Sequence, residues 1–193
     1  VSRCTEGSVP AMKSVLISIR PEWCVKIASG EKTVEVRKTR PKLEPPFRAY
    51  VYCSSVKAMP LHLYVKLHAQ TNGLVDVWNG KVFASFICDR MDTLVPTIEP
   101  YGIYDVDDDY VIQTCLANGA LWDYGDGATL YGWRISALKI YDRPRELSEF
   151  RRGCTNVWQC ESCALYTERT EGCGNSALYL KRPPQSWCYV EKS

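Results

Sequence analysis

Ile17 to Lys38 (ISIRPEWCVKIASGEKTVEVRK) contains strand-like and helix-like patterns in direct succession. Lys13 to Ile19 alternates with a period of two, which predicts a half-buried β-strand. Pro21 to Ala28 (PEWCVKIA) follows with side chains that repeat at a spacing of four, which favours a short amphipathic helix ending at Ser29-Gly30. The sequence therefore predicts a strand that leads directly into a helix.

A second strand is expected after the helix, and one of its faces is polar. Lys32 to Lys38 (KTVEVRK) returns to a period of two, with Val34 and Val36 on one face. The opposite face carries the chemically active side chains of Thr33, Glu35 and Arg37.

The rest of the chain predicts more strands and one further helix. Strands are expected at Ala49 to Cys53, Lys81 to Asp89, Leu130 to Tyr141 and Ser186 to Val190. Asp107 to Ala117 is expected to form a helix that ends at Asn118-Gly119, and its three leading acids suit the positive end of the helix dipole. Cation binding is the alternative role for those acids. Because strands and helices do not alternate regularly, we expect an antiparallel or mixed sheet of the α+β class.

The composition is typical of one globular domain with a small appendage. The chain has 193 residues, of which 46% are hydrophobic and 24% charged, and this argues against general disorder. Its apolar runs are shorter than the roughly 20 residues needed to cross a bilayer, and it opens without an apolar signal segment. We therefore expect a cytoplasmic protein that acts away from membranes.

The charge is unevenly distributed along the chain. Met12 to Arg48 holds nine Lys or Arg against four Glu, whereas Asp89 to Gly127 holds nine acids against Arg90 alone. One interpretation is two solvated faces whose charges cancel. The other is an anion-binding surface built from the first segment.

The strongest local motif is Gly30 to Arg37 (GEKTVEVR), which fits the pattern GxKxxxxR. Glycine allows a sharp turn after the helix, so that Lys32 and Arg37 lie at the start and middle of a strand. Together the two cations could hold a phosphate, a carboxylate or a polarised carbonyl, with Glu35 orienting Arg37 or accepting from a base edge. The alternative is a surface strand with an ordinary Glu–Arg pair.

Two stretches resemble the ASCH domain family, a member of the PUA-like superfamily. Ile17 to Lys38 looks like its opening strand, helix and signature loop, and Leu130 to Pro144 (LYGWRISALKIYDRP) looks like its late strand. The likeness extends from Met12 to about Phe150. It implies a small PUA-like β-barrel with flanking helices, and a cleft beside the GxKxxxxR loop that binds RNA or a nucleobase-like ligand.

Some members of this family are amidohydrolases that remove the acetyl group from acetylated cytidine, and others bind nucleic acid or are ribonucleases. In the amidohydrolases the signature loop supplies a catalytic lysine and, three residues later, a threonine nucleophile. Lys32 matches the lysine, but Glu35 stands at the threonine position, while Thr33 lies one strand step away. A carboxylate can act as a base but cannot replace the hydroxyl in that step. A third catalytic residue, a distal glutamate, has no match, because the expected helix offers Asp107 to Asp109 and Gln113 instead.

We therefore expect a protein that binds RNA or a modified nucleoside in a basic cleft. The alternative is an enzyme of the same family, an amidohydrolase on acetylated cytidine or a nuclease, in which Lys32 acts with Glu35 or Thr33. Most of the six Trp and twelve Tyr are expected in the core, and Trp23 and Trp133 are the aromatic candidates for the cleft because they lie in the family-like stretches. The expected ligand-binding residues are Lys32, Glu35, Arg37, Lys38, Arg40, Trp23 and Trp133.

Four of the ten cysteines lie close together in a polar stretch, at Cys154, Cys160, Cys163 and Cys173. The Cys-x-x-Cys pair can place two thiolates on one metal, and the other two would complete a structural zinc site. This stretch has few apolar residues, so the metal would supply its stability. Free or redox-active thiols and disulfides are the alternatives, and Cys188 is a substitute ligand. Core thiols are expected at Cys24, Cys53, Cys88 and Cys115.

The expected organisation has four parts. Residues 1–11 form a tail, and residues 12–150 form the ASCH or PUA-like domain. Residues 151–176 form a cysteine-rich, zinc-binding insertion, and residues 177–193 return as a C-terminal strand.

Overall fold

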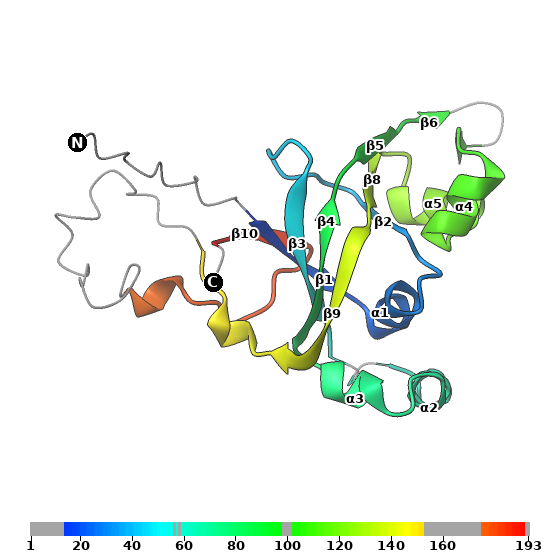
Figure 1. Ribbon diagram of the computed structural model, residues 1–193. Coiled ribbons are helices and arrows are strands. Elements are labelled where there is room, and N and C mark those ends of the chain that lie inside the picture. The colour runs from blue at the N-terminus through cyan, green and yellow to red at the C-terminus, as the bar shows by residue number, and fades with distance from the viewer. Residues whose placement is uncertain (1–13, 56, 58, 98–101, 153–174, 192–193) are drawn as a thin grey trace, which may run out of the picture.

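A five-stranded mixed sheet forms the centre of the computed structural model, which describes residues 14–55, 57, 59–97, 102–152 and 175–191 (Figure 1). Its strands follow the order β10 (Trp187–Val190), β1 (Ser14–Ile19), β3 (Phe47–Cys53), β4 (Val82–Cys88) and β9 (Ser136–Arg145). β1 and β3 run parallel, whereas the other neighbours pair antiparallel. Of the two expected alternatives, an antiparallel or a mixed sheet, the structure shows the mixed sheet.

Two smaller sheets accompany the central one. The first has the order β2 (Val34–Arg37), β8 (Leu130–Arg134) and β5 (Met91–Leu94), and the second pairs β6 (Pro96–Thr97) with β7 (Ile103–Tyr104). Among the described strands, hydrogen bonds do not join these sheets into one closed ring, so the expected barrel is not closed. The single strand expected at Leu130 to Tyr141 is divided at Ile135, because β8 pairs with β2 and β5 while β9 pairs with β4.

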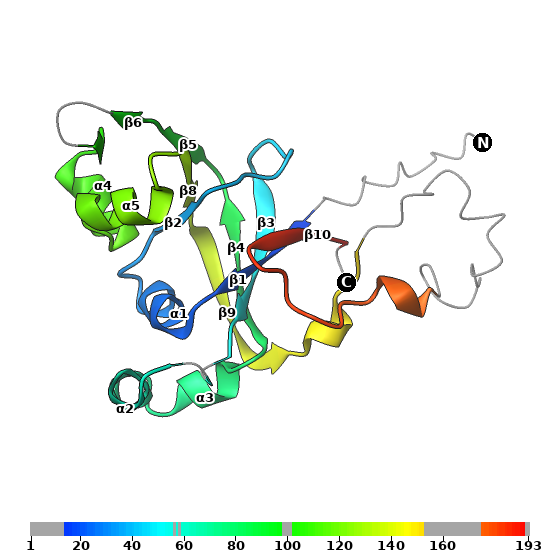
Figure 2. The same cartoon turned by 180° about the vertical axis from the view of Figure 1, so that it is seen from behind.

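The helices gather at the ends of the sheets. Their bounds are α1 (Pro21–Ala28), α2 (Leu61–Gln70), α3 (Leu74–Trp78), α4 (Asp108–Thr114) and α5 (Asn118–Gly125), with short 3-10 helices η2 (Leu147–Glu149) and η4 (Ser176–Leu178). Figures 1 and 2 show α4 and α5 together near the β2–β8 sheet, and α2 and α3 together at another end of the molecule. In the described part of the chain, every helix is too short or too polar to cross a membrane.

Hydrophobic residues cover both faces of β1, which corrects the expected half-buried strand. Val15 and Ile17 belong to a core cluster that also contains α1 residues, whereas Leu16 belongs to a second cluster with Phe150 and Val190. β1 therefore packs against a hydrophobic cluster on each of its two faces. The cluster on one face includes residues of α1, so α1 is held against the sheet.

The helix expected at Asp107 to Ala117 is shorter than predicted. It ends at Thr114, because Cys115 takes a left-handed conformation with φ of 54° and closes α4. Asn118-Gly119, which the sequence suggests as a helix stop, instead opens α5. The tail and the cysteines Cys154, Cys160, Cys163 and Cys173 lie outside the described residues.

Candidate functional site

Gly30 forms the turn between α1 and β2, at the start of the GxKxxxxR motif. Its φ of 80° lies in the left-handed region, where glycine is favoured over other residues. The backbone N–H of Gly30 donates to the Ile27 carbonyl at 3.1 Å, and that of Lys32 donates to the Lys26 carbonyl at 3.0 Å. Lys32 is thereby held just before β2 (Val34–Arg37), rather than at the start of the strand as predicted, and Arg37 is the last residue of β2 rather than in its middle.

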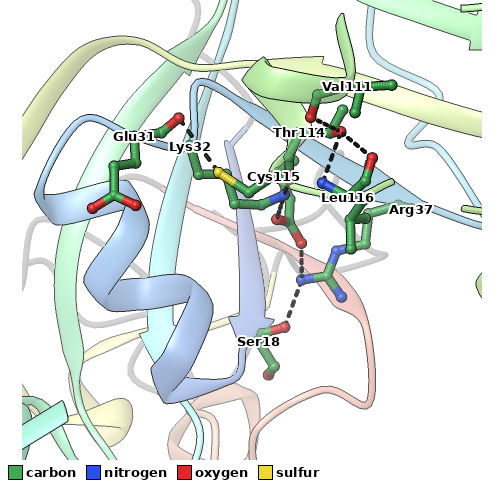
Figure 3. Close-up of polar contacts among 9 residues, drawn as sticks. Ser18, Glu31, Lys32, Arg37, Val111, Thr114, Cys115 and Leu116 are labelled. Atoms are coloured by element: carbon green, nitrogen blue, oxygen red, sulfur yellow. Dashed lines mark hydrogen bonds and ion pairs between the residues drawn. The ribbon is translucent and has the colours of Figure 1, made fainter. Parts of the chain in front are cut away.

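Lys32, Glu35 and Arg37 form a buried array of charges, which we call the Lys32–Glu35–Arg37 array. Its two cations, Lys32 and Arg37, are labelled in Figure 3. The three residues are 2%, 6% and 8% exposed. Glu35 Oε2 lies 3.5 Å from Lys32 Nζ, and Glu35 Oε1 lies 3.0 Å from Arg37 Nη2. An ordinary exposed Glu–Arg pair is therefore excluded.

Backbone carbonyls from other elements also accept hydrogen bonds from both cations. Lys32 Nζ donates to the Thr114 carbonyl at 2.5 Å, at the end of α4, where the helix dipole favours a cation. Arg37 Nη2 donates to the Ser18 carbonyl of β1 at 2.6 Å. Burial lowers the pKa of Lys32 below its ordinary value, and the Glu35 carboxylate opposes this shift.

The array forms part of the wall of a cleft of about 560 Å³. Ligand pockets of small molecules fall in this range of volume. The lining residues are Ser18, Ile19, Arg20, Trp23, Lys32, Glu35, Val36, Arg37, Ser54, Leu116, Tyr124, Pro183, Pro184, Gln185 and Ser186. Four of the expected ligand-binding residues, Trp23, Lys32, Glu35 and Arg37, are thus brought together.

Trp133 lies elsewhere, in the hydrophobic core. It is fully buried, and its ring packs against those of Phe47 and Trp187, with centroids 5.6 and 6.2 Å apart. Trp133 does not line the cleft, because its ring is enclosed in the hydrophobic core.

Lys38, Arg40 and Thr33 also lie outside the cleft lining. Lys38 and Arg40 are exposed, and they lie over the rings of Tyr124 and Tyr131 at 5.3 and 5.8 Å from the centroids. Thr33 precedes β2 and uses its backbone to bind Gln113 and Ile135.

The acids at the start of α4 cap the helix. Asp107 accepts a hydrogen bond from the Tyr110 backbone at 2.7 Å, which supports the capping interpretation. Gln113 accepts from Arg134 Nη1 at 2.7 Å, so its amide is engaged away from the cleft. In the part of the chain that the structure describes, no three His, Cys, Asp or Glu side chains gather to hold a metal.

Sequence reasoning missed two segments that line the cleft. Tyr124 comes from α5, and Pro183 to Ser186 come from the loop before β10. Ser18 ties this loop to β1, because its hydroxyl donates to the Pro184 carbonyl at 2.7 Å and its N–H to the Ser186 carbonyl at 2.9 Å. The pair Pro183-Pro184 before a predicted strand was the available signal for an ordered loop.

No family model matches the chain, and a comparison with curated proteins finds no match. Among solved structures, the chain is similar to ASCH from Zymomonas mobilis, with 18% identity, a TM-score of 0.45, and coverage of 93% of this chain and 89% of that one. A mutant form of the same protein gives 17% identity, a TM-score of 0.44, and coverage of 93% and 91%. These figures describe a likeness only, and neither a ligand nor an activity of those proteins is transferred to this chain.

Proposed function

We propose that the cleft binds a single nucleobase unit, presented by RNA or by a modified nucleoside. The observation that carries this proposal is the Lys32–Glu35–Arg37 array on the cleft wall. Two cations against one carboxylate leave the wall with a net positive charge, which favours an oxygen acceptor on the ligand. The resemblance of the GxKxxxxR motif to the ASCH family supports the same class of ligand.

The free hydrogen-bonding groups of the array are mainly donors. Arg37 makes both of its contacts through Nη2, and within the described residues Nη1 has no hydrogen-bond partner. Each Glu35 oxygen already faces a cation. The array is thus suited to a base edge that carries a carbonyl oxygen.

The size of the cleft favours one base over a duplex. A volume of about 560 Å³ suits a ligand of nucleoside size. Sequence-specific RNA recognition also uses unstacked single bases rather than paired ones.

A titration of matched lysine variants tests this function. Wild type, Lys32→Ala and Lys139→Ala are titrated by calorimetry with cytidine, acetylated cytidine and a short single-stranded RNA. Lys139 is an exposed lysine of β9 outside the cleft, so it controls for loss of charge alone. We expect Lys32→Ala to weaken binding about tenfold or more, since a charged donor is lost, and Lys139→Ala to bind a nucleoside as wild type does. Absence of binding by wild type, or equal binding by Lys32→Ala, would contradict the proposal.

An enzyme is the second candidate, and the lowered pKa of Lys32 favours it. A buried lysine with a depressed pKa can act as a base or nucleophile near neutral pH. Lys32 would then act with Glu35 or Thr33 on acetylated cytidine or on a strand. Incubation of the protein with acetylated cytidine and with labelled RNA tests this, and turnover that disappears in Lys32→Ala would establish an enzyme in place of a binding protein.

We also propose one structural zinc ion at the cysteine cluster. Its support is the spacing of Cys154, Cys160, Cys163 and Cys173 in a stretch poor in apolar residues. A closed site of four thiolates has no open position for water, so its role would be folding.

A further inference from the structure

Tyr124 is an aromatic wall of the cleft that comes from α5. It is 38% exposed, and it lines the same cleft as the Lys32–Glu35–Arg37 array. Burial raises the pKa of its hydroxyl, while Arg37, close enough to interact with it, lowers it. Tyr124 therefore stands near the charged array and also faces solvent, as a residue at a ligand entrance would.

The Tyr124 ring is already held from one side. The ammonium group of Lys38 lies 5.3 Å from the ring centroid, a distance at which a cation is attracted to the face of an aromatic ring. Among the described residues, no aromatic ring and no second cation lies against the Tyr124 ring. Lys38 itself is outside the cleft lining.

Trp23, the other aromatic residue of the lining, contacts two lysines rather than one. Lys32 Nζ and Lys26 Nζ both lie over its ring, at 5.1 and 5.7 Å from the centroid. A base that stacked on Trp23 would compete with two ammonium groups. Trp23 is therefore suited to holding Lys32, and Tyr124 is the aromatic ring that remains for a ligand.

We propose that Tyr124 is the stacking platform for the ligand, so that the cleft selects a planar heteroaromatic ring with an oxygen at its edge. The ring lies against Tyr124, and its oxygen accepts from Arg37 Nη1 or Lys32 Nζ. This rests on the proposed function of the cleft and adds that the ring is required for recognition. A sugar or a sugar phosphate without a base would not be held.

Calorimetric titrations with cytidine and with ribose test the proposal on four proteins: wild type, Tyr124→Phe, Tyr124→Leu and Tyr179→Leu. Tyr179 is a matched control, because it is 41% exposed and lies outside the cleft lining. Phenylalanine keeps the stacking face, so Tyr124→Phe should bind cytidine within about twofold of wild type, and Tyr179→Leu should bind as wild type does. Tyr124→Leu should weaken cytidine binding at least about fivefold, and ribose should not bind.

A second measurement covers the case in which Tyr124→Leu does not fold. In wild type labelled at tyrosine, the Tyr124 ring signal, assigned from the Tyr124→Phe spectrum, should move on cytidine addition through the ring current of the base. Equal cytidine binding by folded Tyr124→Leu, or an unmoved Tyr124 signal in a protein that does bind cytidine, would overturn the stacking role alone. If wild type binds no nucleoside, the proposed function and this inference both fail.

Discussion

The ammonium group of Lys32 donates to the carbonyl oxygen of Thr114 at 2.5 Å and so joins the signature loop to the end of α4. Both residues are buried, and they lie far apart in sequence. The bond carries a charged donor, which makes it stronger than a neutral hydrogen bond. The α4–α5 segment, which also supplies Tyr124 to the cleft, is therefore fixed relative to the array.

Glu35→Gln should destabilise the fold more than the same change at an exposed ion pair. Glu35 neutralises two buried cations, and removing its charge leaves both without a counter-charge. Breaking a buried ion pair in this way costs about 3 kcal/mol. Urea unfolding should show such a loss of unfolding free energy. Glu149→Gln is the control, because Glu149 pairs with Arg145 at the surface. This variant should change the unfolding free energy by less than about 1 kcal/mol. Equal effects of the two variants would refute a structural role for the array.

Binding and catalysis should depend on pH in opposite directions. The pKa of Lys32 is lowered, so this lysine loses its proton at a lower pH than an ordinary lysine. If the charged ammonium group binds the ligand, affinity falls as pH rises through that pKa. If the neutral amine acts as a base, turnover rises through the same pKa. Measurements of affinity and turnover from about pH 6 to 10 distinguish the binding role of Lys32 from the catalytic one. An affinity that does not change with pH, in both wild type and Lys32→Ala, would show that Lys32 does not contact the ligand.

Lys38 and Arg40 should matter more for RNA than for a free nucleoside. Both are exposed and lie outside the cleft lining, beside Tyr124 and Tyr131. If they contact phosphates of a bound strand, Lys38→Ala combined with Arg40→Ala reduces the slope of log affinity against log salt by about 1.4. Cytidine affinity of the same variant should fall less than RNA affinity, because cytidine has no phosphate and loses only the support that Lys38 gives to the Tyr124 ring. An unchanged RNA slope would show that the strand does not pass these residues.

One equivalent of zinc is expected in the full chain purified without chelator. Elemental analysis should give about one zinc per chain, and Cys160→Ser combined with Cys163→Ser should lose it. Less than about half an equivalent in wild type, or sulfur atoms about 2.05 Å apart as in disulfides, would contradict the proposed site.

The opening of the fold could be predicted because its patterns are local. β1, α1 and β2 follow from alternation, from Pro21 at the helix start and from Gly30 at its end, and their observed bounds agree closely with the prediction. α2 could not be predicted in the same way, because Leu67 is its only buried residue and a helical stripe is missing. The division of the late strand at Ile135 depends on pairing with β4 and β8, which sequence alone does not reveal.

The candidate site could be predicted only where it depends on a local sequence pattern. Lys32, Glu35 and Arg37 share one short motif, so their convergence follows from local geometry. Thr114 and Tyr124 reach the cleft only through the packing of α4 and α5, which no local pattern encodes. Trp133 was expected at the cleft but lies in the core. The sequence pattern around a tryptophan in a strand does not show whether its side chain faces the core or a ligand.

A crystal structure of the protein with cytidine shows whether the cleft is a nucleobase site. We expect density for the base inside the cleft, with its carbonyl oxygen within hydrogen-bond distance of Lys32 Nζ or Arg37 Nη1. Density for cytidine elsewhere on the surface, with the cleft filled by water alone, would show that the cleft is not the nucleobase site.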